Sequence, residues 1–459
     1  MAFIRKIRKG NSVYLAEVEN HRVEGKVKQT VIRYLGTEVD GKACKKVFTS
    51  DIEVESVKQY LDYKILHQIS ERLQMPELLG KDMQRILLLV YTQIISRKSM
   101  YKLPEYVEHT ALQEILGFEK LVDKDLYRSL DKIEEIDFVY LENALLQNLL
   151  SSTLRKERKA LVLDVTDTYF AGSQADWKSR RGKDGKYDKL IQIALAVTKD
   201  EGFPIMHRTY EGNISNIYIF KDMLSEVRLQ KFDITVLDRG MICFETIGDL
   251  LKLQQKVITG IKMNDKIHRE YLSRIDREEI FQPNNRIKLR NTIVYTQEFD
   301  FMCGKLIAIY DPHKEAERRT VAMEHKNYNP QKAKYLGYSL LFHTTKLALS
   351  DVVRTYFEKD IVEKAYREIK SVINLNPLRK YRLEHINAHV KICYLAYVLL
   401  AYINFYAKKM ELSANTVLEK MQSVYKVNLK SEKANLNWTK TVTLTKQQQK
   451  ILALLNCSV

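Results

Sequence analysis

The spacing of apolar residues changes along the chain, and each change predicts a different kind of secondary structure. Before residue 50, the runs SVYLAEVEN and KVKQTVIRYLG have the composition of β-strands, and a glycine lies between them. From about 51 onwards apolar residues recur at helical spacing, with Val54, Val57, Leu61 and Ile65 on one face. The pattern predicts a β-rich segment followed by a helical region.

Runs of strand length return after residue 158. They are KALVLDVTDTYF, LIQIALAVT, FPIMHRTYEG, DITVLD and KVITGIK, and helical stretches near 217–229 and 244–253 flank the fourth. Three strands followed by alternating helix and strand are typical of a mixed α/β layer. Charged, strand-like sequence in 263–337 interrupts this layer. A helix with basic residues follows, with Ser350 as its predicted N-cap, and then an apolar helix near 385–408.

Composition narrows the choice of partner and compartment. The 459 residues include 75 Lys and Arg against 58 Asp and Glu, a formal net charge of +17, which favours nucleic acid over the alternatives of solubility alone or an anionic membrane surface. Five cysteines are scattered singly, which argues against a disulfide framework or a structural zinc site. The apolar stretch from Ile392 to Ile403 is shorter than a membrane span. We expect a buried core helix, no membrane partner and a cytoplasmic location.

Two aspartates are candidate catalytic residues because of their positions in short apolar strands. In LVLDVT, Asp164 shares a face with Val162 and Thr166, where a carboxylate is costly unless it is paired or binds a metal. Asp238 ends the run DITVLD, and active sites gather at such strand ends in open α/β sheets. The alternatives are a solvated strand end for Asp164 and the competing acid Asp233 at the start of its strand.

The basic helix carries one carboxylate among cations. Tyr356, Lys359, Glu363 and Lys370 fall within about 60° of one another at about 100° per residue, and Arg367 extends this stripe. The opposite arc is apolar and suited to packing. A solvated face held by i,i+4 ion pairs would not need the tyrosine. The arrangement therefore favours a metal ligand, Glu363, flanked by phosphate contacts.

In this order, the motifs resemble those of bacterial insertion-sequence transposases with a DDE catalytic domain. The helix is similar to their Y-x2-R-x3-E-x6-K signature, with Lys359 in the place of the usual arginine. Asp164 lies in a D-x-T strand and Asp238 in a D-R-G turn, as in that family. The resemblance extends over roughly residues 1–405.

The resemblance implies an RNase H-like α/β fold. Its core is a mixed five-stranded sheet with Asp164 on the first strand, Asp238 just after the fourth and Glu363 on a later helix, interrupted by a β-rich insertion. A β-rich N-terminus and a helical region, which is either a DNA-binding region or a plain bundle, precede it. The expected parts are a β-rich segment at 1–49, a helical DNA-binding region at 50–150, the catalytic core at 151–262, the insertion at 263–337, the second part of the core at 338–408, and a tail at 409–459 that is a candidate for dimerisation.

The implied activity is that of a DNA transposase, which cuts at transposon ends and joins them to target DNA. Asp164, Asp238 and Glu363 are the expected catalytic and metal-binding residues, for two Mg²⁺ or Mn²⁺ ions. The expected partners are double-stranded DNA, both terminal inverted repeats and target, and a second copy of the chain in a homodimer on the bacterial DNA. The expected DNA contacts are Tyr356, Lys359, Arg367 and Lys370.

Two other functions stay open for this sequence. One is an RNase H-like nuclease that cuts DNA without joining it, and the other is a DNA-binding repressor with a vestigial site. A zinc site at His385 and His389 is a weaker alternative, because no third ligand is nearby and the helix around them is apolar.

Overall fold

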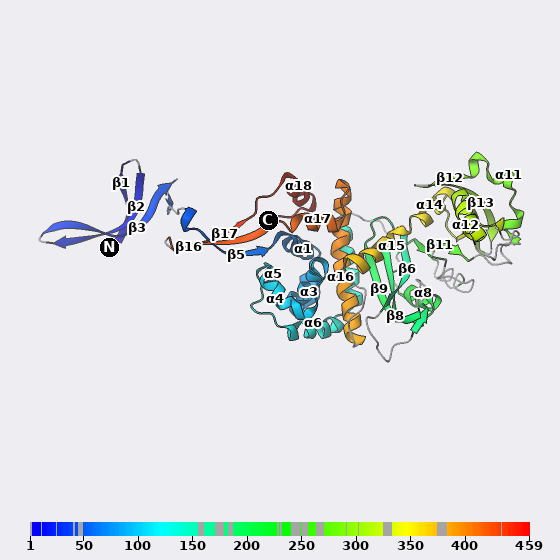
Figure 1. Ribbon diagram of the computed structural model, residues 1–459, viewed down its shortest axis with the longest axis horizontal. Helices are drawn as coiled ribbons and strands as arrows, with labels where there is room; N and C mark the ends of the chain where they lie inside the picture. The colour runs from blue at the N-terminus through cyan, green and yellow to red at the C-terminus, as the bar shows by residue number, and fades with distance from the viewer. Residues whose placement is uncertain are drawn as a thin grey trace.

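The structure is a computed structural model, and it describes most of the chain. The described residues are 2–10, 12–23, 25–39, 42–44, 49–154, 160–169, 179–181, 187–226, 229, 232–239, 248, 256–262, 270–290, 292–301, 303–324, 333–373, 383–432 and 434–459. Over these residues the molecule is elongated, with the N-terminal strands at one end and residues 286–324 at the other (Figure 1). The long helix α16 (Leu383–Ala407) stands between a helical bundle and a large sheet.

The N-terminal residues form a four-stranded antiparallel sheet. Gly25 has a φ of +75° in the turn between the second and third strands, a conformation that glycine adopts readily. The sheet projects from the rest of the molecule (Figure 1). Its strands pair in chain order: β1 (Ala2–Lys9), β2 (Ser12–Val23), β3 (Lys26–Val39) and β4 (Lys42–Cys44).

The helical region begins later than the periodicity predicted. Val54 and Val57 belong to strand β5 (Glu53–Gln59), and the first helix starts at Leu61. The prediction was wrong there because β5 takes its backbone partners from β16, far away in the sequence. The helices that follow are α1 (Leu61–Arg72), α2 (Met75–Leu79), α3 (Met83–Ile95), α4 (Leu103–Glu108), α5 (Leu112–Leu116), α6 (Asp123–Glu135) and α7 (Phe138–Ser152).

Helix α16 is the core of this bundle. It packs against α1, α3 and α6 and also against strand β9 of the large sheet. Its length and composition would suit a membrane span, but 78% of its apolar window is buried inside the protein. All residues from Ile392 to Ile403 are buried, as predicted for a core helix.

The C-terminal residues, predicted as a tail, fold back onto the bundle. β16 lies between β17 and β5 in a three-stranded sheet, so the chain's last part pairs with residues close to the N-terminal sheet. Helix α18 begins with a capping box between Thr445 and Gln448. The elements are α17 (Ala414–Met421), β16 (Tyr425–Ser431), β17 (Leu436–Thr441) and α18 (Lys446–Leu455).

The large sheet has ten strands among the described residues, and it is mixed. β10 runs parallel to both β6 and β11, whereas β6 and β9 run antiparallel to β8. Helix α8 (Asn216–Ser225) follows β9; the helix predicted at 244–253 lies, apart from residue 248, outside the described residues. This half of the sheet contains β6 (Ala160–Tyr169), β7 (Ser179–Arg181), β8 (Tyr187–Thr198), β9 (Pro204–Glu211), β10 (Ile234–Leu237) and β11 (Lys256–Ile261).

The insertion extends this sheet, so its strands are continuous with the core that it was predicted to interrupt. β15 pairs with β11 on one side and with β14 on the other, which joins the two sets of strands. Part of the insertion is helical, because α12 (Pro312–Glu324) follows β14. The strands of the insertion are β12 (Arg286–Lys288), β13 (Ile293–Phe301) and β14 (Gly304–Tyr310), and they are linked to β11 by β15 (Tyr338–His343), which the predicted bounds put in the second part of the core.

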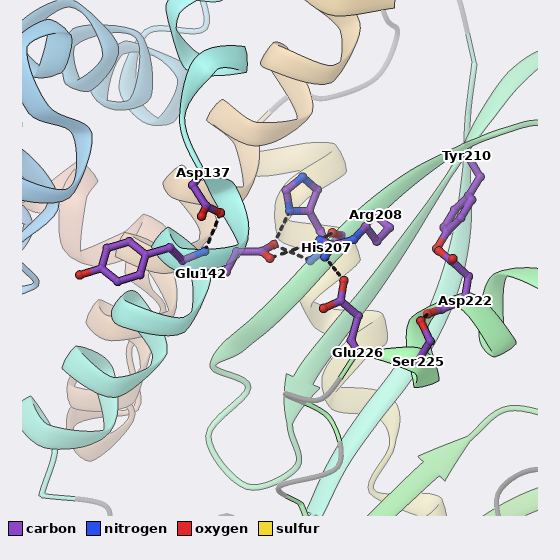
Figure 2. A network of polar contacts seen from close by, with 9 residues as sticks. Asp137, Glu142, His207, Arg208, Tyr210, Asp222, Ser225 and Glu226 are labelled. Carbon is purple, nitrogen blue, oxygen red and sulfur yellow. Dashed lines mark hydrogen bonds and ion pairs between the residues drawn. The ribbon is translucent and has the colours of Figure 1, made fainter. Parts of the chain in front are cut away.

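A buried ion-pair network joins α7 of the bundle to β9 of the sheet (Figure 2). Glu142 Oε1 accepts from the backbone N–H of His207 and lies 2.8 Å from His207 Nδ1, and Glu142 Oε2 lies 3.3 Å from Arg208. Arg208 also pairs with Glu226, and the Tyr394 ring stacks on His207 with centroids 4.8 Å apart. Because Glu142 is fully buried, its charge depends on these partners. The network fixes the bundle to the sheet.

Candidate active site

Asp164 and Asp238 come side by side on neighbouring parallel strands. β6 and β10 pair in register up to Leu163 and Leu237, and the next residue of each chain segment is the aspartate. Residues paired in this way point to the same face of a sheet. Leu163 and Val165 on the opposite face are fully buried, whereas both aspartates are partly exposed. The sheet thus presents two adjacent carboxylates.

The helix that was expected to carry the cationic stripe is broken. α14 (Leu349–Phe357) and α15 (Asp360–Arg367) are separate helices, and a π-helical turn (Glu368–Val372) follows the second. The predicted N-cap, Ser350, was wrong. Ala348 occupies the cap position of α14 in an extended conformation and makes no side-chain cap bond, so the helix begins without the hydroxyl that the prediction required.

Two residues in and just before helix α15, Lys359 and Tyr366, contact the two aspartates. Lys359 Nζ, just before the helix, is 2.6 Å from Asp238 Oδ1. The Tyr366 hydroxyl donates to the backbone oxygen of Asp164 at 2.5 Å. Glu363 follows Lys359 by four residues and precedes Tyr366 by three, so its side chain shares the face that these two contacts turn toward the sheet.

Lys359 offsets part of the negative charge of the two aspartates in this structure. Burial alone would lower the pKa of its ammonium, but Tyr356 and Asp238, with a further contribution from Asp164, more than offset burial, so this pKa is raised. The Lys359 side chain is 20% exposed and that of Asp238 is 41% exposed. The ion pair between Lys359 and Asp238 is therefore open to solvent on one side, and the cation bound at Asp238 is the ammonium of Lys359.

A cavity of about 910 Å³ opens beside this pair. Asp238, Lys359 and Glu363 lie on its lining, and so do the cations Lys262, Lys314, Arg239 and Arg318. In the part of the chain that the structure describes, no group of three or more His, Cys, Asp or Glu side chains is arranged to hold a metal ion. The structure thus brings Asp164 next to Asp238 and turns Glu363 toward the same cavity, but does not close the three into a metal cage.

Tyr356 lines the same cavity from the end of α14. Lys359 Nζ lies 5.2 Å from the centroid of the Tyr356 ring, a cation–π distance. Burial raises the pKa of the Tyr356 hydroxyl, with Lys359 acting against this and Asp238 adding to it. A Cβ at Gly260 of β11 would overlap the Tyr356 hydroxyl and lie 2.8 Å from Arg239 Cβ. Gly260 therefore makes room for the tyrosine at the edge of the site.

The other two cations of the predicted stripe are placed differently. Lys370 Nζ donates to Thr166 Oγ1 and to the backbone oxygen of Asp167, both at 2.6 Å, so it holds β6 from the π-helical turn. Arg367 is exposed at the end of α15. Neither residue belongs to the lining of the cavity.

Two features of the site were missed from the sequence. Tyr366 is buried and touches the backbone beside Asp164, although its spacing of three from Glu363 already indicated the same face. Lys314 and Arg318 come from α12, in a region that was predicted to be strand-like. Their spacing of four residues, which puts both on one face of a helix, was the available signal.

The alternative zinc pair is used in packing. His385 Nε2 lies 2.9 Å from Asp131 Oδ1 on the bundle surface. His389 Nε2 lies 3.8 Å from Cys393 Sγ, one turn further along α16. These contacts favour a packing role over zinc binding for both histidines.

Comparison of the chain with known proteins identifies a family to which it is similar. Residues 155–399, more than half of the chain, match the family model described as a transposase DDE domain. Among solved structures, the chain is similar to the cryo-EM structure of the piggyBac transposase synaptic complex with hairpin DNA. That likeness has a TM-score of 0.41 and 12% identity, and covers 79% of this chain and 78% of the other. No curated protein matches the chain.

Proposed function

The chain belongs to the family of transposases with a DDE domain, and we propose that Asp164, Asp238 and Glu363 are its three catalytic acids. As a member of this family it is a DNA transposase, an enzyme that cuts and joins DNA. The observation that carries the residue assignment is the register of β6 with β10, because it puts two aspartates next to each other. Glu363 completes the set from α15, which packs against β6 and follows directly after the contact of Lys359 with Asp238.

The family uses divalent metal ions, and we infer that this chain binds two Mg²⁺ or Mn²⁺ ions. Carboxylate oxygens suit such hard cations, and the three acids would hold them. The donor set fits a cation, because Asp238 already binds the ammonium of Lys359. When bound, the ions supply positive charge at the attacking and the departing oxygen of a phosphodiester.

The chain's own residues position the DNA. Lys262 and Lys314 lie on the lining of the cavity that Asp238 and Glu363 share, so a phosphate could lie between the acids and these cations. Lys359 would then pass from Asp238 to a phosphate when a metal ion takes its place. Tyr356 would contact the same strand from the cavity edge, which keeps both residues as proposed DNA contacts.

Lys370 and Arg367, the other proposed DNA contacts, have different support. Arg367 is exposed and can reach a phosphate outside the cavity. Lys370 is bound to Thr166 and Asp167, so its contact with DNA would be secondary to holding the strand that carries Asp164.

We further propose that five strands of the large sheet form an RNase H-like core. Their spatial order is β9, β8, β6, β10 and β11, with the first chain segment in the middle and parallel pairing on one side only. This order supports the proposal because it brings the middle strand, which carries Asp164, next to the strand that ends at Asp238. In this view β12 to β15 are additions along one edge.

Amide substitutions test the assignment. Asp164→Asn, Asp238→Asn and Glu363→Gln should each slow Mg²⁺-dependent cleavage by at least about two to three orders of magnitude, the scale of losing one group that stabilises developing charge. The substrate is a supercoiled plasmid that carries the gene with its flanking DNA, and DNA binding is followed by fluorescence anisotropy. Asp360→Asn is the matched control, since Asp360 lines the same cavity but pairs with Lys364 at 2.7 Å.

Each outcome has a definite meaning. Loss of cleavage with unchanged DNA binding supports the triad, whereas wild-type cleavage by any one of the three variants removes that residue from it. Cleavage without joining of the cut ends to a second plasmid would favour the nuclease alternative. DNA binding without any metal-dependent cut by the wild-type protein would favour the repressor.

A further inference from the structure

The four-stranded N-terminal sheet has two faces of different chemistry. Phe3 pairs with Val18, and Val18 pairs with Val31, so these three side chains share one face. The pairing of β1 with β2 is regular throughout, and register shifts occur only between β2 and β3. Alternation along β1 and β2 therefore assigns their other side chains to one face or the other, and each β3 side chain shares the face of the β2 residue with which it pairs.

All three carboxylates of these strands lie on the face opposite Phe3. Glu17 and Glu19 flank Val18 on β2, and Glu38 is next to Thr37, which pairs with Tyr14 on the Phe3 face. Two of them hold cations of the same face: Arg33 Nε lies 2.7 Å from Glu17, and Lys6 pairs with Glu38. This face carries further cations, but its acids offset part of their charge.

The other face, here called the acid-free face, carries cations, amides and exposed rings without a carboxylate among the described strands. Phe3 is 43% exposed and Tyr34 is 62% exposed. Gln29 bonds both to Asn20, at 2.8 Å, and to Arg5. The residues used in the argument below are Phe3, Arg5, Asn20, Arg22, Gln29 and Tyr34.

We propose that the acid-free face binds double-stranded DNA. A surface with arginines and no carboxylate attracts a polyanion, and phosphate contacts supply most of the affinity of proteins for duplex DNA. Amide and guanidinium groups such as Gln29 and Arg5 can also bind base edges, and a β-ribbon fits the major groove. The sheet stands away from the bundle, so a duplex can approach it without meeting the helices (Figure 1).

A second copy of the chain fits this surface less well. In a symmetric dimer the same patch meets itself. Arg5, Lys9 and Arg22 of both copies would then be gathered in one interface with no acid of these strands to pair with them. Duplex DNA instead offers a negative charge at each phosphate. Charge complementarity therefore selects DNA as the occupant.

The inference rests on the proposed function, since DNA is the substrate of the catalytic site, and it moves the expected DNA contact within the N-terminal third. The helices predicted as the DNA-binding region bury their apolar faces against α16. The sheet of residues 2–44 projects from the bundle and is therefore the N-terminal surface that DNA can reach (Figure 1). It would hold a duplex at the end of the molecule farthest from residues 286–324 (Figure 1).

The test compares two double variants of the full-length protein that remove equal charge from the two faces. Arg5→Ala with Arg22→Ala changes the acid-free face, and Lys6→Ala with Arg33→Ala changes the opposite one. Anisotropy of a labelled duplex of mixed sequence is measured over a range of KCl concentrations. The first variant should reduce the slope of log K against log salt by about two, one for each lost phosphate contact. The second should bind as the wild-type protein does.

Circular dichroism and metal-dependent plasmid nicking accompany the measurement. Equal losses in both double variants would show a net-charge effect and overturn the proposal, as would wild-type binding by the first. Unchanged DNA binding with a dimer that dissociates in the first variant would make the face a subunit interface instead. Nicking at saturating protein should persist in both variants. If the wild-type protein itself does not nick the plasmid, the catalytic assignment is wrong, whereas the proposed DNA contact of the sheet is unaffected.

Discussion

Two charge clusters in this protein differ in how completely their ionic groups are enclosed. Glu142 is fully buried between the bundle and the sheet, and protein groups surround both of its oxygens. Asp238 is 41% exposed beside a cavity, and its carboxylate pairs with the ammonium of Lys359. Glu142 joins two layers of the fold, whereas Asp238 faces open space.

The difference separates structural charges from charges that are available for chemistry. A buried ion pair contributes to a fixed geometry, and removal of one partner leaves an uncompensated charge in the interior. A half-exposed pair contributes little to stability, because water screens it and can replace either partner. In the proposed function, the Lys359 ammonium occupies Asp238 when no metal ion is bound there, and a metal ion can replace it. The next variants test this contrast, beginning with the largest expected change in stability.

Glu142→Gln should destabilise the protein by about 3 kcal/mol, at the lower end of the cost of breaking a buried ion pair. The amide keeps the shape of the side chain but leaves Arg208 and His207 without the negative charge. Urea unfolding monitored by circular dichroism measures the free energy. Glu226→Gln is the control, since the Glu226 side chain is 24% exposed and its loss should cost at most about 1 kcal/mol. Similar costs for the two variants would contradict the contrast drawn here.

Gly260→Ala should destabilise the protein by about 1–3 kcal/mol, the usual cost of overpacking. The added Cβ meets the Tyr356 hydroxyl and Arg239 Cβ, so Tyr356 must move from the cavity edge. Tyr356→Phe removes one of the two clashes, and Gly260→Ala should therefore cost less in that background. A double-mutant cycle of unfolding free energies measures this coupling. Strict additivity would mean that the two residues do not meet as described.

The residues of the proposed site were selected by local signals, whereas the frame around them was not predictable in that way. Asp164 and Asp238 were selected because a carboxylate in or after a short apolar strand is unusual. Glu363 was selected because helical spacing sets it among cations. The angular argument assumed one continuous helix, yet α14 ends at Phe357 and α15 starts at Asp360. Of the stripe, Lys359 and Glu363 line the cavity, Arg367 and Lys370 do not, and Tyr356 reaches the cavity from the end of α14.

The parts that could not be predicted depend on pairings between distant segments. β5 is a strand because β16 lies beside it, and the insertion joins the sheet because β15 pairs with both β11 and β14. Neither pairing leaves a periodic signal in the local sequence. The same holds for the link between Lys359 and Asp238, which are 121 residues apart. Spacing predicts which residues share a face, but the partner across that face comes only from the fold.

The smallest expected change in stability belongs to Lys359. Lys359→Ala should alter the unfolding free energy by at most about 1 kcal/mol, because the pair with Asp238 is half-exposed.

The same substitution should have larger effects on binding, and these should be opposite for Mn²⁺ and for DNA. Loss of the ammonium frees Asp238, so Mn²⁺ should bind more tightly, as measured by electron paramagnetic resonance of the free ion. Loss of a phosphate contact should lower the salt slope of DNA binding by about one. Lys359→Arg should keep DNA binding, since guanidinium also binds phosphate. Lys364→Ala is the control, because Lys364 is a nearby lysine that pairs with Asp360 and not with Asp238. If Mn²⁺ binding is the same in Lys359→Ala and Lys364→Ala, Lys359 does not compete with metal ions for Asp238. The comparison would then no longer support a role of the Asp238 cluster in binding cations.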